Sequence, residues 1–387
     1  MPARQLTQRE LVPNVEGVSS HEHHAGPCFP FPHIFMRSLL TLTLALGLTG
    51  VVHAQSTSTT IQSGTGHTIT LDQSGVADAY VEQSGSFNNA GVYQDGTAIQ
   101  ATVIQTGARN LAFVDQGVFT FPGIGDSDAT IEQPGTDNVG YVLQGDGNSL
   151  SGTVYQAGVF GDAEVRQSGL GHVGTVDQLE GTNNVGYTSQ LGGAFNEAGI
   201  VQDGDDNDAT ITQTGNEHTA TVKQVGDRNV STITQDGFNN RAADRTTRGN
   251  DNVLTIDQID SDNIAVSHIW GDRNTITVTQ SGNNQEVDLD GRRNTTAPVL
   301  GVNDNVIDFD QAGGDNFIGG WLEDGASGNM ITVSQDGSNN SVSGGPFGPG
   351  LYVEGDMNTI TITQTGVGNT ANAAALGDGN SVTITQF

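Results

Sequence analysis

Residues 202–240 decide the fold and read QDGDDNDATITQTGNEHTATVKQVGDRNVSTITQDGFNN. Their glutamines recur at a constant spacing of eleven residues, at Gln202, Gln213, Gln224 and Gln235. The same phrase surrounds the last two of them. It places Asn or His, a small residue, Val or Ile, and then Gln at alternate positions, and it continues with Gly and Asn. Self-similarity at a fixed period is typical of a repeat architecture.

Each eleven-residue unit predicts a strand of seven residues followed by a turn of four. Alternation with a period of two puts the Asn or His, the small residue, the Val or Ile and the Gln on one face of that strand. The Gly that lies two residues after the Gln provides the backbone freedom that a tight reversal needs. Two units then form one coil of about 22 residues, and identical amides of successive coils should lie in line.

The register extends in both directions from this stretch. The other glutamines that keep it are Gln62, Gln73, Gln83, Gln94, Gln105, Gln116, Gln133, Gln144, Gln156, Gln167, Gln178, Gln190, Gln258, Gln280, Gln311, Gln335, Gln364 and Gln386. Insertions interrupt it at 117–128 and 341–353, and it weakens over 241–310. Because no Pro- or Gly-rich linker separates parts of different composition, we predict one repeat domain over residues 55–387.

Composition agrees with a thin, repetitive core. The chain has 387 residues, of which 54 are glycine, 34% are hydrophobic and 6% are aromatic, too few apolar residues for conventional thick cores. The fixed period argues against disorder, because Val and Ile recur where a narrow core needs them. We predict an all-β fold, a β-solenoid of about fifteen two-strand coils with two stacked parallel sheets.

Charge excludes two classes of partner. The net charge is −31, from 13 basic and 44 acidic residues, which disfavours binding to a nucleic acid or to an anionic membrane surface. Most acids fall in turns, where solubility and turn chemistry explain them. The single cysteine, Cys28, excludes an intramolecular disulfide.

The N-terminus has the pattern of a secretory signal. Arg37 is followed by an apolar run and by the small residues before Gln55, so residues 36–54 are interpreted as a signal peptide, too short to span a membrane. Residues 1–35 are then an N-terminal extension from a start codon assigned too early, and they are predicted to be disordered. Their His21-Glu22-His23-His24 run and Cys28 could also bind a soft metal, which is the weaker hypothesis.

The ends of such a stack predict its function. The last coil at each end presents an unpaired strand edge, and Ser381–Gln386 is a well-formed strand with no obvious cap. Edges of this kind polymerise unless they are covered. We therefore expect the chain to add end to end into a cross-β fibre, with itself as the partner.

The repeated phrase resembles the curlin repeat of curli fibre subunits. It is nearly complete in 89–94, 110–116, 229–240 and 358–369. The resemblance implies a secreted subunit of a functional amyloid on the bacterial surface, used in adhesion and biofilm matrix. It also implies other curli-type subunits and an outer-membrane export pore as partners. No cofactor, metal or nucleic acid is implied, nor membrane insertion after signal removal.

The resemblance and the alternation together predict a set of inward-facing ladder residues. They are Gln73, Gln94, Gln105, Gln202, Gln213, Gln224, Asn229, Gln235, Asn240, Gln280, Gln335, Gln364, Asn369 and Gln386. The chain departs from the family in two ways. It is much longer than the familiar subunits, and the stretch between Gln55 and the first coil is short for export targeting.

Other classes of function remain open. The Thr-x-Thr ranks at Thr275–Thr279 and Thr359–Thr363 would suit an ice-binding solenoid, or another ligand-binding extracellular adhesin that stays monomeric. A calcium-binding β-roll repeats every nine residues, a period that does not occur here. An enzyme would need a non-repeating constellation of residues. His218 replaces the usual Asn, so it is interpreted as a polar substitute, and no catalytic residue is predicted.

Overall fold

A computed structural model describes residues 56–117, 124–290, 302–322, 325–343 and 350–387. The predictions for the 1–35 extension and for the 36–54 signal peptide lie outside these residues. The insertions at 117–128 and 341–353 are described only in part. The first described strand begins at Thr57.

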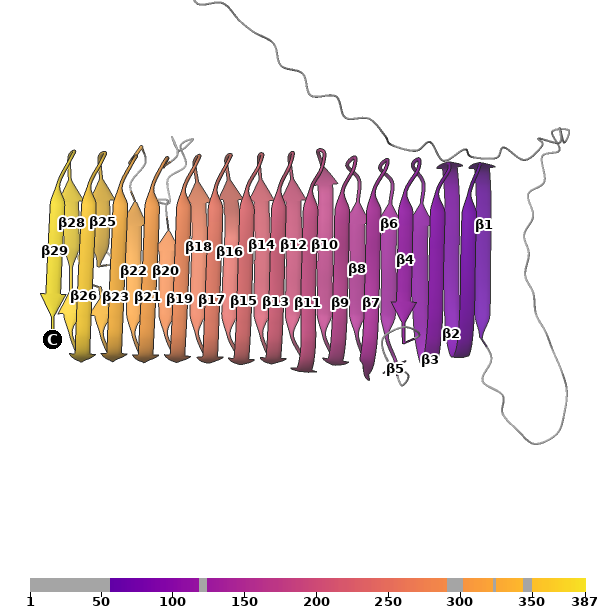
Figure 1. Ribbon diagram of the computed structural model, residues 1–387, viewed down its shortest axis with the longest axis horizontal. Helices are drawn as coiled ribbons and strands as arrows, with labels where there is room; N and C mark the ends of the chain where they lie inside the picture. The colour runs from indigo at the N-terminus through magenta and orange to yellow at the C-terminus, as the bar shows by residue number, and fades with distance from the viewer. Residues whose placement is uncertain (1–55, 118–123, 291–301, 323–324, 344–349) are drawn as a thin grey trace, which may run out of the picture. The chain divides into compact units, whose positions relative to one another are not determined.

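The described residues form a β-solenoid of parallel strands, and 74% of them lie in strands. Each strand pairs with a strand of the next coil, as β13 (Asp208–Asn216) does with β15 (Val230–Phe238). Figure 1 shows the resulting row of arrows, which runs from β1 to β29. There are about 13 turns, fewer than the fifteen expected. The reason is that three of the longer steps between successive ladder glutamines span 28, 31 and 29 residues.

The strands form two sheets, joined because β2 and β3 each run through both. One sheet, which we call the long-ladder sheet, contains the first halves of β2 (Thr68–Ser86) and β3 (Asn89–Gln105), β4 (Leu111–Gln116), β7 (Val139–Asn148), β9 (Asp162–Leu170), β11 (Val185–Ala194), β13, β15, β17 (Val253–Ser261), β19 (Thr275–Asn283), β21 (Val306–Gly314), β23 (Met330–Ser338), β26 (Thr359–Val367) and β29 (Ser381–Gln386).

The facing sheet, which we call the short-ladder sheet, contains β1 (Thr57–Thr65), the second halves of β2 and β3, β6 (Asp128–Gln133), β8 (Ser151–Gln156), β10 (Val173–Glu180), β12 (Glu197–Asp203), β14 (Thr219–Val225), β16 (Arg241–Arg248), β18 (Ile264–Trp270), β20 (Glu286–Asp290), β22 (Phe317–Leu322), β24 (Ser341–Val342), β25 (Leu351–Glu354), β27 (Thr370–Ala371) and β28 (Ala373–Leu376). The short strand β5 (Ile124–Gly125) pairs with β3 and β7 at one edge.

Strict alternation creates the core between these sheets. In β13 the side chains of Ala209, Ile211 and Gln213 are buried, while Thr210 and Thr212 between them are half-buried on the outer face. Threonine and β-branched residues fit such a pleated surface. Because each glutamine pairs with the glutamine of the next coil, the same inward set recurs along the stack.

The turns explain the glycines that follow the glutamines. Gly215 has φ of 114°, and a Cβ there would lie 2.0 Å from the carbonyl oxygen of Gly237 on the next coil. Only glycine combines that backbone angle with that close approach. The residue before each Asn or His is left-handed as well, for example Glu217 and Arg228 with φ of 58° and 56°.

Candidate functional site

The long-ladder sheet contains a continuous column of glutamine amides. Along it each Nε2 donates to the Oε1 of the next glutamine at 2.7–3.0 Å. We call this column the long ladder; its members are Gln73, Gln94, Gln116, Gln144, Gln167, Gln190, Gln213, Gln235, Gln258, Gln280, Gln311, Gln335, Gln364 and Gln386. All are buried except Gln73 and Gln386 at its two ends, which are half-buried.

A second column, the short ladder, lies in the facing sheet and ends partway along it. Its members are Gln62, Gln83, Gln105, Gln133, Gln156, Gln178, Gln202 and Gln224, joined by bonds of 2.8–3.1 Å. Beyond Gln224 the equivalent positions hold Thr247 and then Ile269. This is where the register weakens in the sequence.

The glutamines also tie the two sheets together. Gln213 Nε2 donates to the main-chain oxygen of Glu197 at 2.9 Å, and Gln224 Nε2 donates to that of Asp208 at 3.0 Å. Each amide therefore bonds to a neighbouring coil and to the facing strand. Buried amides that satisfy both hydrogens in this way stabilise a single register, because a slip would leave them unpaired.

Asparagines form two further columns at the turns. Asn229 Oδ1 accepts the main-chain N–H of Asn252 at 3.2 Å, and Asn240 Oδ1 accepts that of Asn263 at 3.0 Å. Asn369 belongs to the same pattern but lies near one end of the stack, where it is half-buried. The predicted set of ladder residues contains only some members of the glutamine and asparagine columns. The remaining members have Gln or Asn at equivalent positions of the repeat.

Two buried histidines, and the half-buried His67 near one end of the stack, substitute for asparagine in this pattern. His218 Nδ1 accepts the N–H of Asn240 at 3.1 Å, while its Nε2 lies 3.0 Å from the Thr214 carbonyl oxygen. His172 has the equivalent contacts with Asn196 and Ser168. Burial lowers the pKa of both rings. These contacts require a neutral ring with its proton on Nε2, so both side chains are structural.

Acidic side chains in the turns also have structural partners. Asp205 Oδ1 accepts the N–H of Thr182 at 2.8 Å, and Asp227 Oδ1 accepts that of Asp205 at 2.9 Å. Arginine and aspartate also pair between coils, as Arg228 and Asp251 do at 2.7 Å. The arginine lowers the pKa of the Asp251 carboxyl. The acids therefore satisfy backbone groups and balance nearby charge.

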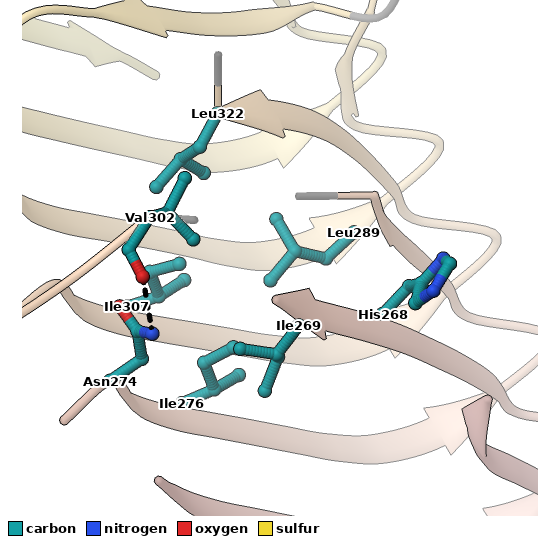
Figure 2. A pocket seen from close by; sticks show the side chains of 8 residues that line it. All are labelled: His268, Ile269, Asn274, Ile276, Leu289, Val302, Ile307 and Leu322. Atoms are coloured by element: carbon teal, nitrogen blue, oxygen red, sulfur yellow. Dashed lines mark hydrogen bonds between the residues drawn. The ribbon is translucent and has the colours of Figure 1, made fainter. Parts of the chain in front are cut away.

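The structure shows little room for a small ligand in the core. Figure 2 shows a void lined mainly by aliphatic side chains, among them Ile269, Leu289 and Leu322. Its volume is about 10 Å³, which is space for about one water molecule. Among the described residues no group of three or more His, Cys, Asp or Glu side chains could hold a metal ion. This void is a packing defect beyond the end of the short ladder.

The two ends of the stack are open in the described residues. At one end Ile69 and Leu71 of β2 are only partly buried, and at the other Val382 and Ile384 of β29 are partly buried as well. Gln386 accepts from Gln364 at 2.8 Å and donates to the Thr370 oxygen at 2.9 Å. The long ladder thus reaches both ends with the same chemistry.

These features define a class of protein, a β-solenoid repeat protein with a core of stacked amides. A family model described as Curlin associated repeat matches residues 192–215, 215–243 and 355–387. The chain therefore contains curlin repeats in these three stretches, as the resemblance in its sequence indicated. No curated protein matches it. None of the described residues forms a helix that could cross a membrane.

Proposed function

We propose that the protein is a secreted subunit of a curli-like amyloid fibre that grows by end-on stacking of solenoids. In this proposal the fibre serves bacterial surface adhesion and the biofilm matrix. The curlin repeats support the class of subunit, and a parallel solenoid of stacked amides suits a structural role.

One observation carries the proposal: the long ladder reaches β29 at one end and β2 at the other. With β29 of one copy beside β2 of the next, Gln386 would continue the column into Gln73, and Ile384 would pack beside Leu71. The strands would then keep the spacing of about 4.8 Å that holds within any sheet. An open edge with a half-buried core gains both hydrogen bonds and apolar burial by this addition.

Partners follow from the same proposal. The first partner is a second copy of the chain, and other curli-type subunits with amide ladders would fit the same ends. Secretion through a dedicated outer-membrane pore accords with the signal peptide interpreted at residues 36–54. The net charge of −31 would keep the unassembled chain soluble during export.

Electron microscopy and fibre diffraction of the purified chain test the proposal. The expected result is unbranched, thioflavin-positive fibres with reflections near 4.7–4.8 Å and about 10 Å. Cells that produce the protein should bind Congo red, and cells that lack it should not. A chain that stays monomeric at high concentration for days would contradict the proposal.

A second candidate function rests on the outer face of the long-ladder sheet. Thr232 and Thr234 align in register with Thr210 and Thr212 on the preceding coil. Such a flat hydroxyl array would suit an ice-binding protein that stays monomeric. Asp257, which follows Thr234 in the same column, breaks the array. A thermal hysteresis assay on the monomer separates this candidate from the fibre subunit.

A further inference from the structure

The strand β16 (Arg241–Arg248) interrupts the regular stack. Thr221 of β14 pairs with Ala243, and Gln224 pairs with Thr247, so two residues of β14 oppose three residues of β16. An extra residue of this kind is a β-bulge, which bends and locally weakens a strand pair. The short ladder ends at the same place, because Thr247 follows Gln224 in its column.

The bulge places a carboxylic acid inside the core. Asp244 is 1% exposed and is the inward residue between Ala242 and Thr247, in the region where β14 has Val222. Its Oδ2 accepts from Thr247 Oγ1 at 3.0 Å and lies 3.5 Å from Ser231 Oγ on the facing sheet. Its Oδ1 has no hydrogen-bond partner.

The next strand of the short-ladder sheet contains a second buried polar group without a hydrogen-bond partner. Ser267 of β18 pairs with Asp244 in the sheet and is also 1% exposed. Its Oγ has no hydrogen-bond partner either. Two adjacent buried polar groups without partners on neighbouring coils are rare in folded proteins. A proton on Asp244 would give its carboxyl one donor, which the ionised form lacks.

No described group inside the core neutralises Asp244. The inward residues of the packed strands are uncharged: Ala220, Val222 and Gln224 of β14, Ser231, Ile233 and Gln235 of β15, Leu254, Ile256 and Gln258 of β17, and Ala265, Ser267 and Ile269 of β18. The nearby charged side chains Lys223, Arg241 and Arg248 are exposed on the outer face. Asp257 of β17 also alternates outward. A buried charge without a partner is costly, so the neutral acid is favoured.

We propose that β16 is a proton-dependent joint in the solenoid. While Asp244 is protonated, the coils on either side form one continuous stack, and loss of that proton weakens the stack at β16. In a repeat protein each coil contacts mainly its neighbours, so one weak interface separates two cooperative blocks. The block before the joint has both glutamine ladders, and the block after it has only the long ladder.

The joint would regulate assembly, a consequence that rests on the proposed function. Burial raises the pKa of Asp244 from 3.8 to about 7, and the hydrogen bonds from Thr247 and Ser231 act in the opposite direction. The folded carboxyl therefore keeps its proton in a range where the unfolded one has lost it. Stability from this group is complete below about pH 4 and is lost as the pH rises to about 7. Mild acidity would favour a complete, assembly-competent stack.

Urea unfolding of the dilute, unassembled chain at pH 4.5 and 7.5 tests the joint. The variants are Asp244→Asn, which cannot ionise, and Asp244→Val, which copies Val222. One bound proton changes the unfolding constant by up to tenfold per pH unit. The unfolding constant of the wild type, relative to either variant, should rise more than tenfold from pH 4.5 to 7.5. The matched control Asp257→Asn, on the outer face, should follow the wild type.

Two results would overturn the joint. One is a wild-type to variant ratio that is the same at both pH values. The other is failure of both variants to fold at either pH, since an uncharged residue should be tolerated at this position. Hydrogen exchange, corrected for intrinsic rates, should lose protection at pH 7.5 first in β14, β16 and β18; loss confined to the two ends would also contradict it. None of these measurements needs fibres, so a chain that never polymerises would refute the proposed function alone.

Discussion

The Gln224 amide donates across the core to the Ser231 hydroxyl at 3.0 Å, in addition to the Asp208 oxygen. The equivalent amide of Gln213 instead donates to Gln235 on the next coil at 2.9 Å. One ladder thus ends inside the molecule while the other continues to both ends. The two sheets of the solenoid therefore differ: glutamine side-chain bonds join all the coils of the long-ladder sheet but only part of the short-ladder sheet.

Breaking the long ladder should be costly. Gln235→Leu removes the bonds to Gln213 and Gln258 and leaves buried amide groups of both unpaired. The expected loss is about 2–4 kcal/mol in the free energy of unfolding, measured by urea titration. The control Thr234→Val changes an outward neighbour and should cost less than about 1 kcal/mol. Equal effects of the two changes would show that the ladder contributes little.

The buried histidines should make the protein sensitive to acid. Burial lowers the pKa of His172 and His218 below the ordinary value of 6.5, so the unfolded chain binds protons more readily. The contribution of these two rings to stability should therefore fall as the pH drops below about 6.5, opposite in sign to the contribution of Asp244. His218→Asn keeps an acceptor for the Asn240 N–H and should reduce this loss in thermal melts between pH 7 and 5. His268→Asn, on the outer face, serves as the control and should retain it.

Glycine in the turn should be irreplaceable, whereas glycine in a strand should not. Gly215→Ala places a Cβ against the Gly237 oxygen at a φ of 114°, so we expect a loss of about 3 kcal/mol. The nearest atom to a Cβ at Gly199 is Thr175 Oγ1 at 3.3 Å, and that hydroxyl can rotate. Gly199→Ala should be neutral or slightly stabilising. Similar melting temperatures for the two variants would refute the turn argument.

The ion pairs between turns should contribute little. Arg228 and Asp251 lie 2.7 Å apart, but their side chains are 54% and 41% exposed. Exposed pairs of this kind contribute little to stability, because water screens the two charges. Arg228→Gln should therefore shift the urea midpoint only slightly, and adding salt should not change the difference much. A large, salt-sensitive loss would mean that the column of charges acts as a network.

Growth of the fibre should depend on whether a charged side chain in β29 faces the core or the outside. Ile384 of β29 faces the core and is partly buried, whereas Thr385 beside it is exposed. Ile384→Lys should stop addition at this end, because a buried ammonium without a partner is unfavourable. Thr385→Lys carries the same charge outward and should still form fibres. Thioflavin kinetics and electron microscopy compare them; equal growth would show that this end is not used.

Period-two alternation was enough to predict much of the fold. It indicated parallel coils and the side of the strand that Gln213 and Gln235 occupy, and both side chains are fully buried in the structure. It overestimated the number of turns, because long insertions use residues without repeating the phrase. The role of His218 needed the structure, since only the contacts of both ring nitrogens show how an imidazole replaces an amide.

The sequence could not indicate Asp244 as a core residue. Where the eleven-residue repeat is weak, a charged side chain is most simply assigned to the surface. The extra residue in β16 changes which residues point inward, and a bulge depends on pairing with strands more than twenty residues away. Pairing between such distant segments is decided by the whole stack rather than by the local phrase.

The hydrogen bonds of both ladders point in the same direction along the solenoid axis. Every glutamine–glutamine bond of the ladders runs from an Nε2 to the Oε1 on the coil of higher residue number, as from Gln213 to Gln235 and from Gln364 to Gln386. One terminus of a filament would therefore offer amide protons and the other would offer carbonyl oxygens. Such a filament would be polar, with unequal elongation speeds at its two termini, and two filaments could not anneal with like termini together.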